Sequence, residues 1–198
     1  MTLVDRFLSG LAPRLPADDA PMWGWIEGAS STDLQRLRER WPQVPDSLLA
    51  LLGRVDGTHY RPYPQGEVNL LMLGSDLGSY PYYLRSVEQM FEDSVQWDGW
   101  GESIRSIYEE WLEEDPAILG AGIDADLPMG RRLCFAHCAN NGGTSVLYLD
   151  FDPAPGGRVG QVVRYLHDPD SYAVIAPSFD AYLQQLIDGG YAFIDKDA

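Results

Sequence analysis

Residues 131–166 read RRLCFAHCANNGGTSVLYLDFDPAPGGRVGQVVRYL, and this stretch decides the fold. It alternates three apolar runs with two turn-forming segments: 133–136, NNGG at 140–143, 146–151, DPAPGG at 152–157, and 161–166. Asn and Gly tolerate the positive φ angles that tight hairpin turns demand. Val, Tyr, Leu and Phe suit a pleated, half-buried surface. The pattern therefore predicts three consecutive antiparallel strands.

The middle strand of this predicted meander has two faces, because side chains alternate along a strand. One face carries the more apolar side chains and is expected to face the core: Leu147, Leu149 and Phe151. The other face carries Val146, Tyr148 and Asp150. The same alternation predicts that Cys134 and Cys138, four residues apart on or near the first strand, point to one side.

The remaining sequence predicts capped helices and a few short extended segments. Helices are expected after a Thr2 cap, over 33–41, over 47–54 with Asp46 as cap, from Val87 after a Ser86–Gln89 capping box, over 102–114, and after Ser178. Residues 68–73 and 82–84 are predicted to be extended, and 167–173 to be a turn-rich loop. The glycine-containing segment QWDGWG at 96–101 is predicted to end the helix that begins at Val87.

Two stretches of the sequence resemble the SUKH superfamily. GGTSVLYLDFDPAPGGRVGQVVRYLHD, followed by Ser178-Phe179 and an amphipathic helix, is similar to its C-terminal half. VPDSLLALL at 44–52, followed by Asp56-Gly57, resembles the N-terminal pattern of Leu-Pro, helix and Asn-Gly, with Val in place of Leu and Asp in place of Asn. The resemblance covers residues 33–187, which is most of the chain.

The resemblance implies a fold and a class of function. Helix pairs followed by strands and a closing helix already indicate an α+β domain, with a mostly antiparallel sheet of about four to six strands and helices packed on one face. Most bacterial members of the superfamily are immunity proteins that neutralise polymorphic toxins, so the expected role is binding of a cognate toxin domain without catalysis. The alternative is a regulatory or scaffolding module without a toxin partner, nearer to the fungal cell-wall assembly regulators.

Length and composition are those of one globular domain without a membrane span. We expect an N-terminal helix and linker at 1–21 and the SUKH-like domain at 22–198, in a chain of 198 residues. No apolar run approaches the ~20 residues of a membrane helix. Asp5 and Arg6 interrupt the apolar pattern of the N-terminus, which is unlike a secretion signal, so a cytoplasmic protein is expected.

The net charge of −16 and the pI near 4.3 limit the choice of partner. They argue against nucleic acids and anionic membranes, which require Lys and Arg, and they favour a basic partner or simple solubility. Residues 91–126 hold 11 acidic residues and only one basic residue, Arg105, so most of the excess lies in this segment.

The acidic segment contains the predicted partner-binding residues. The expected helix 102–114 has an apolar stripe of Ile104, Ile107, Tyr108, Trp111 and Leu112. Its acids near the C-terminal end oppose the helix dipole, which indicates a role other than stability. Two tryptophans flanked by acids are the expected anchors of an interface. The predicted site comprises Trp97, Asp98, Trp100, Glu102, Glu109, Glu110, Glu113 and Glu114. A solvated acidic face that serves solubility is the simpler alternative.

No pattern predicts a catalytic centre, a cofactor or a metal. Phosphate-binding, dinucleotide-binding and nucleophile-elbow motifs are absent from the sequence. Cys134, His137 and Cys138 lack the spacing of a zinc site, and buried structural cysteines are the preferred interpretation. His167-Asp168 lies in an expected turn, away from further ligands. The tryptophans and acids at 97–102 would suit a glycoside hydrolase, which is the weaker alternative to partner binding.

Overall fold

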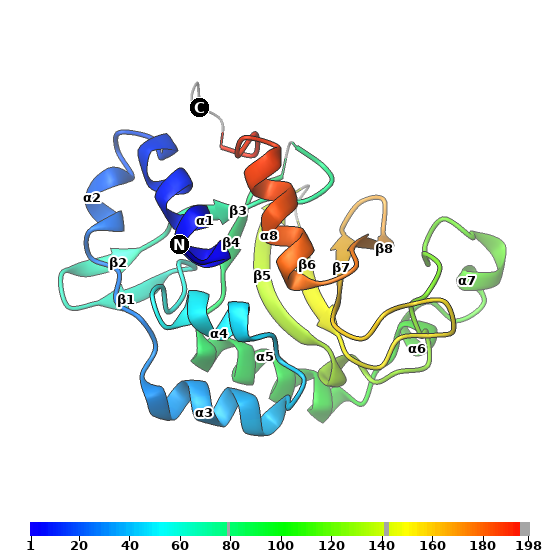
Figure 1. The fold of residues 1–198 in the computed structure, drawn as a ribbon. Coiled ribbons are helices and arrows are strands. Elements are labelled where there is room, and N and C mark those ends of the chain that lie inside the picture. The colour runs from blue at the N-terminus through cyan, green and yellow to red at the C-terminus, as the bar shows by residue number, and fades with distance from the viewer. Residues whose placement is uncertain (79, 141–142, 195–198) are drawn as a thin grey trace.

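A six-stranded antiparallel sheet forms the centre of the protein (Figure 1). The computed structural model describes residues 1–78, 80–140 and 143–194. The six strands follow chain order across the sheet: β3 (Leu71–Leu73), β4 (Tyr82–Leu84), β5 (Leu133–Asn140), β6 (Gly143–Asp150), β7 (Gln161–Leu166) and β8 (Ser171–Ala176). A second sheet pairs β1 (Arg61–Tyr63) with β2 (Gly66–Val68). Together with the helices, the sheets give the predicted α+β class.

The predicted meander is confirmed as β5, β6 and β7. Both pairs are antiparallel, and Leu149 of β6 lies opposite Leu133 on one side and Val162 on the other. The turn after β6 is closed by backbone hydrogen bonds, including one of 2.7 Å from the Gly160 N–H to the Asp150 carbonyl. Of the predicted NNGG turn, residues 141 and 142 lie outside the described residues.

Eight α-helices are present in the described ranges. They are α1 (Leu3–Leu11), α2 (Ala20–Trp23), α3 (Ser31–Arg40), α4 (Asp46–Leu52), α5 (Val87–Trp100), α6 (Ile104–Tyr108), α7 (Trp111–Glu114) and α8 (Phe179–Asp188). The predicted caps Thr2, Ser86 and Ser178 each accept a hydrogen bond from the backbone N–H three residues later. The prediction for Asp46 is wrong: it is the first residue of α4, Pro45 takes the cap position, and the Asp46 side chain pairs with Arg38.

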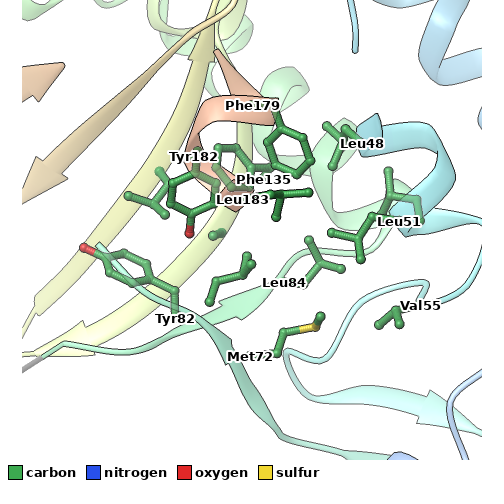
Figure 2. Close-up of a cluster of buried hydrophobic side chains, with 14 of the residues drawn as sticks. Leu48, Leu51, Val55, Met72, Tyr82, Leu84, Phe135, Phe179, Tyr182 and Leu183 are labelled. Atoms are coloured by element: carbon green, nitrogen blue, oxygen red, sulfur yellow. The ribbon is translucent and has the colours of Figure 1, made fainter. Parts of the chain in front are cut away.

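The main core lies between the sheet and helices α1, α4 and α8. Phe135 of β5 packs against Phe179 and Tyr182 of α8, with ring centroids 5.5 Å and 5.8 Å apart (Figure 2). Leu147, Leu149 and Phe151 all belong to this core, as predicted. Residues of α1 join the same core, because Phe7 and Leu11 are fully buried within it.

The opposite face of the sheet holds a second, smaller core. Val146 and Tyr148, the outward residues of β6, are buried here together with Ile104 of α6. The rest of this outer cluster consists of Ile123, Ala125, Met129, Cys134, Val163 and Tyr172. The C-terminal half of the acidic segment is therefore attached to the sheet by apolar packing.

Two segments differ from the sequence-based prediction. Residues 68–73 are not one strand, because Leu70 leaves the line of the strand and donates its backbone N–H to the Thr58 carbonyl at 2.9 Å. Residues 167–173 are not all loop, because β8 begins at Ser171 and pairs with β7. Tyr172 lies directly opposite Tyr165, with ring centroids 4.8 Å apart, and this cross-strand contact extends the sheet.

A β-bulge in β5 overturns the prediction that the two cysteines point to one side. The pairing between β5 and β6 shifts between Cys134 and Ala136, so that one extra residue is inserted in β5. Beyond the bulge the alternation of faces is reversed. Cys134 consequently lies in the outer cluster and Cys138 in the main core, and both are buried and free.

Candidate partner-binding surface

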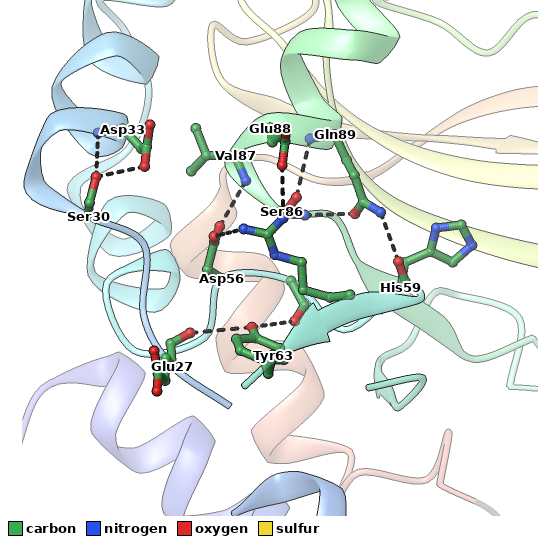
Figure 3. Close-up of polar contacts among 12 residues, drawn as sticks. Glu27, Ser30, Asp33, Asp56, His59, Tyr63, Ser86, Val87, Glu88 and Gln89 are labelled. Carbon is green, nitrogen blue, oxygen red and sulfur yellow. Dashed lines mark hydrogen bonds and ion pairs between the residues drawn. The ribbon is translucent and has the colours of Figure 1, made fainter. Parts of the chain in front are cut away.

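Helix α5 carries the predicted tryptophans, and contacts fix its N-terminal end. Ser86 and Gln89 form the predicted capping box, and the Asp56 carboxylate accepts the Val87 N–H at 3.0 Å (Figure 3). The Gln89 amide reaches back to the His59 carbonyl at 2.8 Å. The capping box and the Asp56 bond satisfy N–H groups at the start of the helix, which have no partner within it.

The helix continues further than predicted. QWDGW is helical, and α5 ends only at Gly101, which takes the left-handed conformation with φ of 64° and donates its N–H to the Trp97 carbonyl. Glycine adopts this conformation without a steric penalty, so Gly101 rather than Gly99 ends the helix. Trp97 and Trp100 therefore lie one turn apart on the same helix, with ring centroids 4.9 Å apart in an edge-to-face arrangement.

The predicted single helix 102–114 is wrong: the chain forms two short helices, α6 and α7. The break is at Glu109, which has φ of 47°. Tyr108 stays attached to the sheet, because its hydroxyl donates to Asp170 at 2.5 Å and its ring meets Tyr172 edge-to-face. After the break, Leu112 packs on the outer cluster, whereas Trp111 is 65% exposed.

The α6–α7 segment presents acids that have no basic partner. Glu109, Glu110, Glu113 and Glu114 are exposed, and Glu102 is half-buried. None of these five forms an ion pair with a described residue. Arg105, the one base in the segment, pairs with Asp126 at 2.6 Å. Figure 1 shows α7 beyond β8 at one end of the molecule.

Asp98 of the predicted site is directed elsewhere. Its carboxylate accepts a 2.9 Å bond from Arg40 of α3, and it lies against Gly130. Arg40 also contacts Ser94 and the Gly130 carbonyl, so this group holds α5 against α3 and residues 129–131. Asp98 is thus bound within the fold, unlike the glutamates of α6–α7.

The two tryptophans line a pocket of about 210 Å³ on the outer face of the sheet. Its walls are Asp93, Gln96, Trp97, Trp100, Cys134, His137, Thr144, Val146, Tyr148 and Tyr165. Trp97 is half-buried, whereas Trp100 is 55% exposed at the C-terminal end of α5. Most of these residues lie in β5, β6 and β7, which are distant from α5 in the sequence. Of the residues that line the pocket, only the two tryptophans belong to the predicted site.

A buried ion pair lies at one side of this pocket. Arg85 donates to both carboxylate oxygens of Asp93, at 2.6 Å and 2.9 Å, and to His59 Nδ1 at 2.8 Å. His137 Nε2 lies 3.5 Å from Asp93 Oδ2. Burial raises the pKa of Asp93 more than the neighbouring Arg85 lowers it.

Asp93, Cys134 and His137 form a set of metal-type ligands, with one donor atom of each within 4.8 Å of the others. Carboxylate, thiolate and imidazole are zinc ligands. However, both oxygens of Asp93 are bonded to Arg85, whose guanidinium would repel a second cation. We interpret the cluster as a buried ion pair with neutral neighbours.

The sequence matches one known protein family. The model of the SMI1/KNR4 family (SUKH-1) matches residues 28–185, which is most of the chain. The chain belongs to the SMI1/KNR4 (SUKH-1) family. No curated protein matches the sequence. The match spans both the meander and the acidic segment, and it begins after α1 and α2.

This SUKH-1 chain holds no helix, among residues 1–78, 80–140 and 143–194, that is long and apolar enough to cross a membrane.

Two features of the functional surface could not be predicted from the periodicity of the sequence. Trp111 fits the apolar stripe of an unbroken helix, and only the break at Glu109 exposes it. The Arg85–Asp93 pair joins residues whose spacing gives no signal of contact.

We expect His137 to make the stability of this SUKH-1 protein sensitive to acid. Burial, and then Arg85 and His59, lower the pKa of His137 from 6.5 to about 3. Below pH 6.5 the unfolded chain binds a proton that the native state does not, so stability is lost as the pH falls towards 3. The expected loss from His137 is about 2 kcal/mol between pH 8 and pH 5.

Urea unfolding of wild type and His137→Gln at pH 8, 7, 6 and 5 measures this loss. The variant is expected to lose about 2 kcal/mol less than wild type over this range. Because Asp93, Arg85 and His59 are present in both proteins, the difference isolates His137. Parallel pH profiles would show that the imidazole is protonated as readily in the folded protein as in the unfolded chain.

Proposed function

We propose that this protein is a non-enzymatic immunity protein that binds and neutralises a cognate, basic toxin domain. The observation that carries the proposal is the α6–α7 surface, defined as Glu109, Glu110, Glu113, Glu114 and the exposed Trp111. Membership of the SMI1/KNR4 (SUKH-1) family is consistent with it. A basic toxin domain offers the opposite charge to this surface.

The charge of the surface suits rapid association. Exposed, unpaired acids create a field that extends about one Debye length, ~8 Å at physiological salt, and steers a basic partner towards them. Charge complementarity of this kind mainly increases the association rate and the specificity. Trp111, which is 65% exposed beside these acids, provides an aromatic contact that charge alone does not.

Binding rather than catalysis is also supported by the state of the polar groups near the pocket. The Cys134 thiol is buried, and desolvation raises its pKa well above the ordinary value, so it is a poor nucleophile. Burial and Arg85 keep His137 neutral down to acidic pH. Asp93 is held by Arg85. These groups are constrained in ways that oppose proton transfer and nucleophilic attack.

The proposal is tested with any toxin domain that a gene next to the gene for this chain encodes. Co-expression should restore growth to cells that produce the toxin domain, and the two purified proteins should form a complex that weakens as salt is raised. If no neighbouring gene encodes a toxin, and the protein protects against no toxin domain of the same genome, the regulatory or scaffolding alternative is favoured.

Charge reversal should weaken the complex selectively. We expect Glu110→Lys with Glu113→Lys to reduce affinity for the toxin domain by roughly 10- to 100-fold at low salt, mainly through slower association, because two exposed charges are inverted. Surface plasmon resonance at 50 mM and 300 mM salt measures both rates. Glu109 is left unchanged because its φ is positive.

The matched control is Asp18→Lys with Glu67→Lys. It makes the same change of net charge on exposed acids near α2 and in β2, at the opposite end of the molecule in Figure 1. Its affinity is expected to fall by much less than that of the α6–α7 variant. Equal losses in both variants would mean that only net charge matters, and that the toxin does not contact the α6–α7 surface.

A further inference from the structure

The pocket beside α5 has the form of a receptor for one side chain. Trp97 and Trp100 approach it from the helix, and Tyr148 and Tyr165 from neighbouring strands β6 and β7. Its volume of about 210 Å³ equals that of roughly seven water molecules in the liquid. Aromatic rings on both sides give it apolar walls that suit a flat ring.

The charged groups at the pocket favour a neutral occupant. Arg85 does not line the pocket, but it is bonded to both carboxylate oxygens of the lining residue Asp93, and its charge helps to keep the lining residue His137 unprotonated, so it opposes a cationic group in the pocket. An anionic group would meet the Asp93 carboxylate and the acid-rich segment 91–126. The Arg85–Asp93 pair itself is nearly neutral, because the two side chains form a bidentate ion pair.

The pocket also offers polar side chains that an occupant would remove from water. Gln96 and Thr144 are exposed and make no hydrogen bond within the described part of the chain, and His137 Nε2 lies 3.5 Å from the Asp93 carboxylate. A purely apolar occupant would bury some of these groups without a partner, which costs free energy. A neutral ring with one hydroxyl satisfies both the walls and the polar groups.

We propose that this pocket receives one tyrosine side chain of the protein partner. The inference rests on the proposed function, since it assumes a partner with a basic surface that the acids of α6–α7 attract. The two tryptophans of the pocket and those acids are close in sequence, because Trp100 ends α5 and α6 begins at Ile104. A tyrosine that inserts here supplies the buried aromatic anchor of the interface, and the surrounding charges supply steering.

Small analogues of side chains test the pocket without the partner. The probes are p-cresol for tyrosine, 4-methylanisole as its counterpart without a hydroxyl donor, and n-propylguanidinium for arginine. Binding is followed by the ¹H–¹⁵N NMR signals of the Trp97 and Trp100 indole N–H groups. We expect saturable shifts with p-cresol, about fivefold weaker binding of 4-methylanisole through loss of one hydrogen bond, and weaker binding still of the guanidinium probe.

Two tryptophan variants locate the binding. Trp100→Leu removes a largely exposed ring that the fold does not need, and it should weaken p-cresol binding about two- to tenfold. Trp111→Leu removes an exposed ring that does not line the pocket, and binding should be unchanged. Finally, saturating p-cresol should lower the affinity of wild type for the toxin domain.

The results separate this inference from the proposed function. The tyrosine pocket is refuted if p-cresol gives no saturable shift, if n-propylguanidinium binds more tightly, or if bound p-cresol leaves the affinity for the toxin domain unchanged. The Glu110 and Glu113 reversal remains a separate test of the α6–α7 surface, since those residues do not line the pocket.

Discussion

Phe135→Ala is expected to lower the free energy of unfolding by about 3–5 kcal/mol, the cost of removing a large aromatic side chain from a well-packed core. Phe135 is fully buried and lies at the bulge of β5. Its ring packs against Phe179 and Tyr182 of α8. The substitution therefore leaves a cavity between the sheet and the C-terminal helix.

Urea unfolding followed by circular dichroism measures the effect of Phe135→Ala. Val95→Ala is the control, because Val95 is 68% exposed on α5 and its truncation should change stability by less than about 0.5 kcal/mol. A loss below about 1 kcal/mol for Phe135→Ala would mean that the surrounding side chains close the cavity. In that case the contact between β5 and α8 contributes little to the fold.

Phe135 also lies at the point in β5 beyond which the alternation of side chains no longer predicts which face of the sheet a residue occupies. Period-two patterning correctly assigned Leu147 and Leu149 of β6 to the main core. It failed in β5, because the bulge between Cys134 and Ala136 adds a residue to one strand only. A bulge depends on how two strands pair, so the alternation of side chains within one strand does not predict it. The orientation of the cysteines was therefore predicted wrongly.

The candidate surface was predictable in composition but not in shape. The acidic glutamates are exposed because an unpaired charge is costly to bury, and composition alone indicates that. The break at Glu109 directly follows Tyr108, which contacts Asp170 and Tyr172, far along the chain. The exposed position of Trp111 follows from that break. Long-range contacts of this kind leave no signal in helical periodicity.

The pocket was also predictable only in part from the sequence. The acids that flank Trp97 and Trp100 predict these side chains as interface anchors. The structure adds residues from β5, β6 and β7, which meet α5 only in the folded chain. Asp93 lines the pocket and is held by Arg85, so the stability of that pair bears on both the fold and the proposed tyrosine site.

Asp93→Leu is expected to destabilise the protein by about 3–5 kcal/mol, because it leaves the Arg85 guanidinium buried without its counter-ion. Arg85 and Asp93 are both largely buried, and their closest atoms are 2.6 Å apart. His59 Nδ1 would remain as an acceptor for Arg85, but a neutral ring does not replace the lost charge. The reverse change, Arg85→Met, should also destabilise, since it leaves the Asp93 carboxylate without a cation.

The double variant Arg85→Met with Asp93→Leu distinguishes the two contributions to this loss. Burial raises the pKa of Asp93 more than Arg85 lowers it, which indicates that removal of water from the carboxylate outweighs the attraction within the pair. Replacement of both charges by apolar side chains should therefore recover most of the stability lost by Asp93→Leu, to within about 1 kcal/mol of wild type. Urea unfolding of wild type, both single variants and the double variant completes the cycle. The contrary result is a loss of unfolding free energy in the double variant that equals the sum of the losses in the two single variants. That result would mean that the two side chains are not coupled. Each would then contribute separately, through contacts with groups such as His59 and His137.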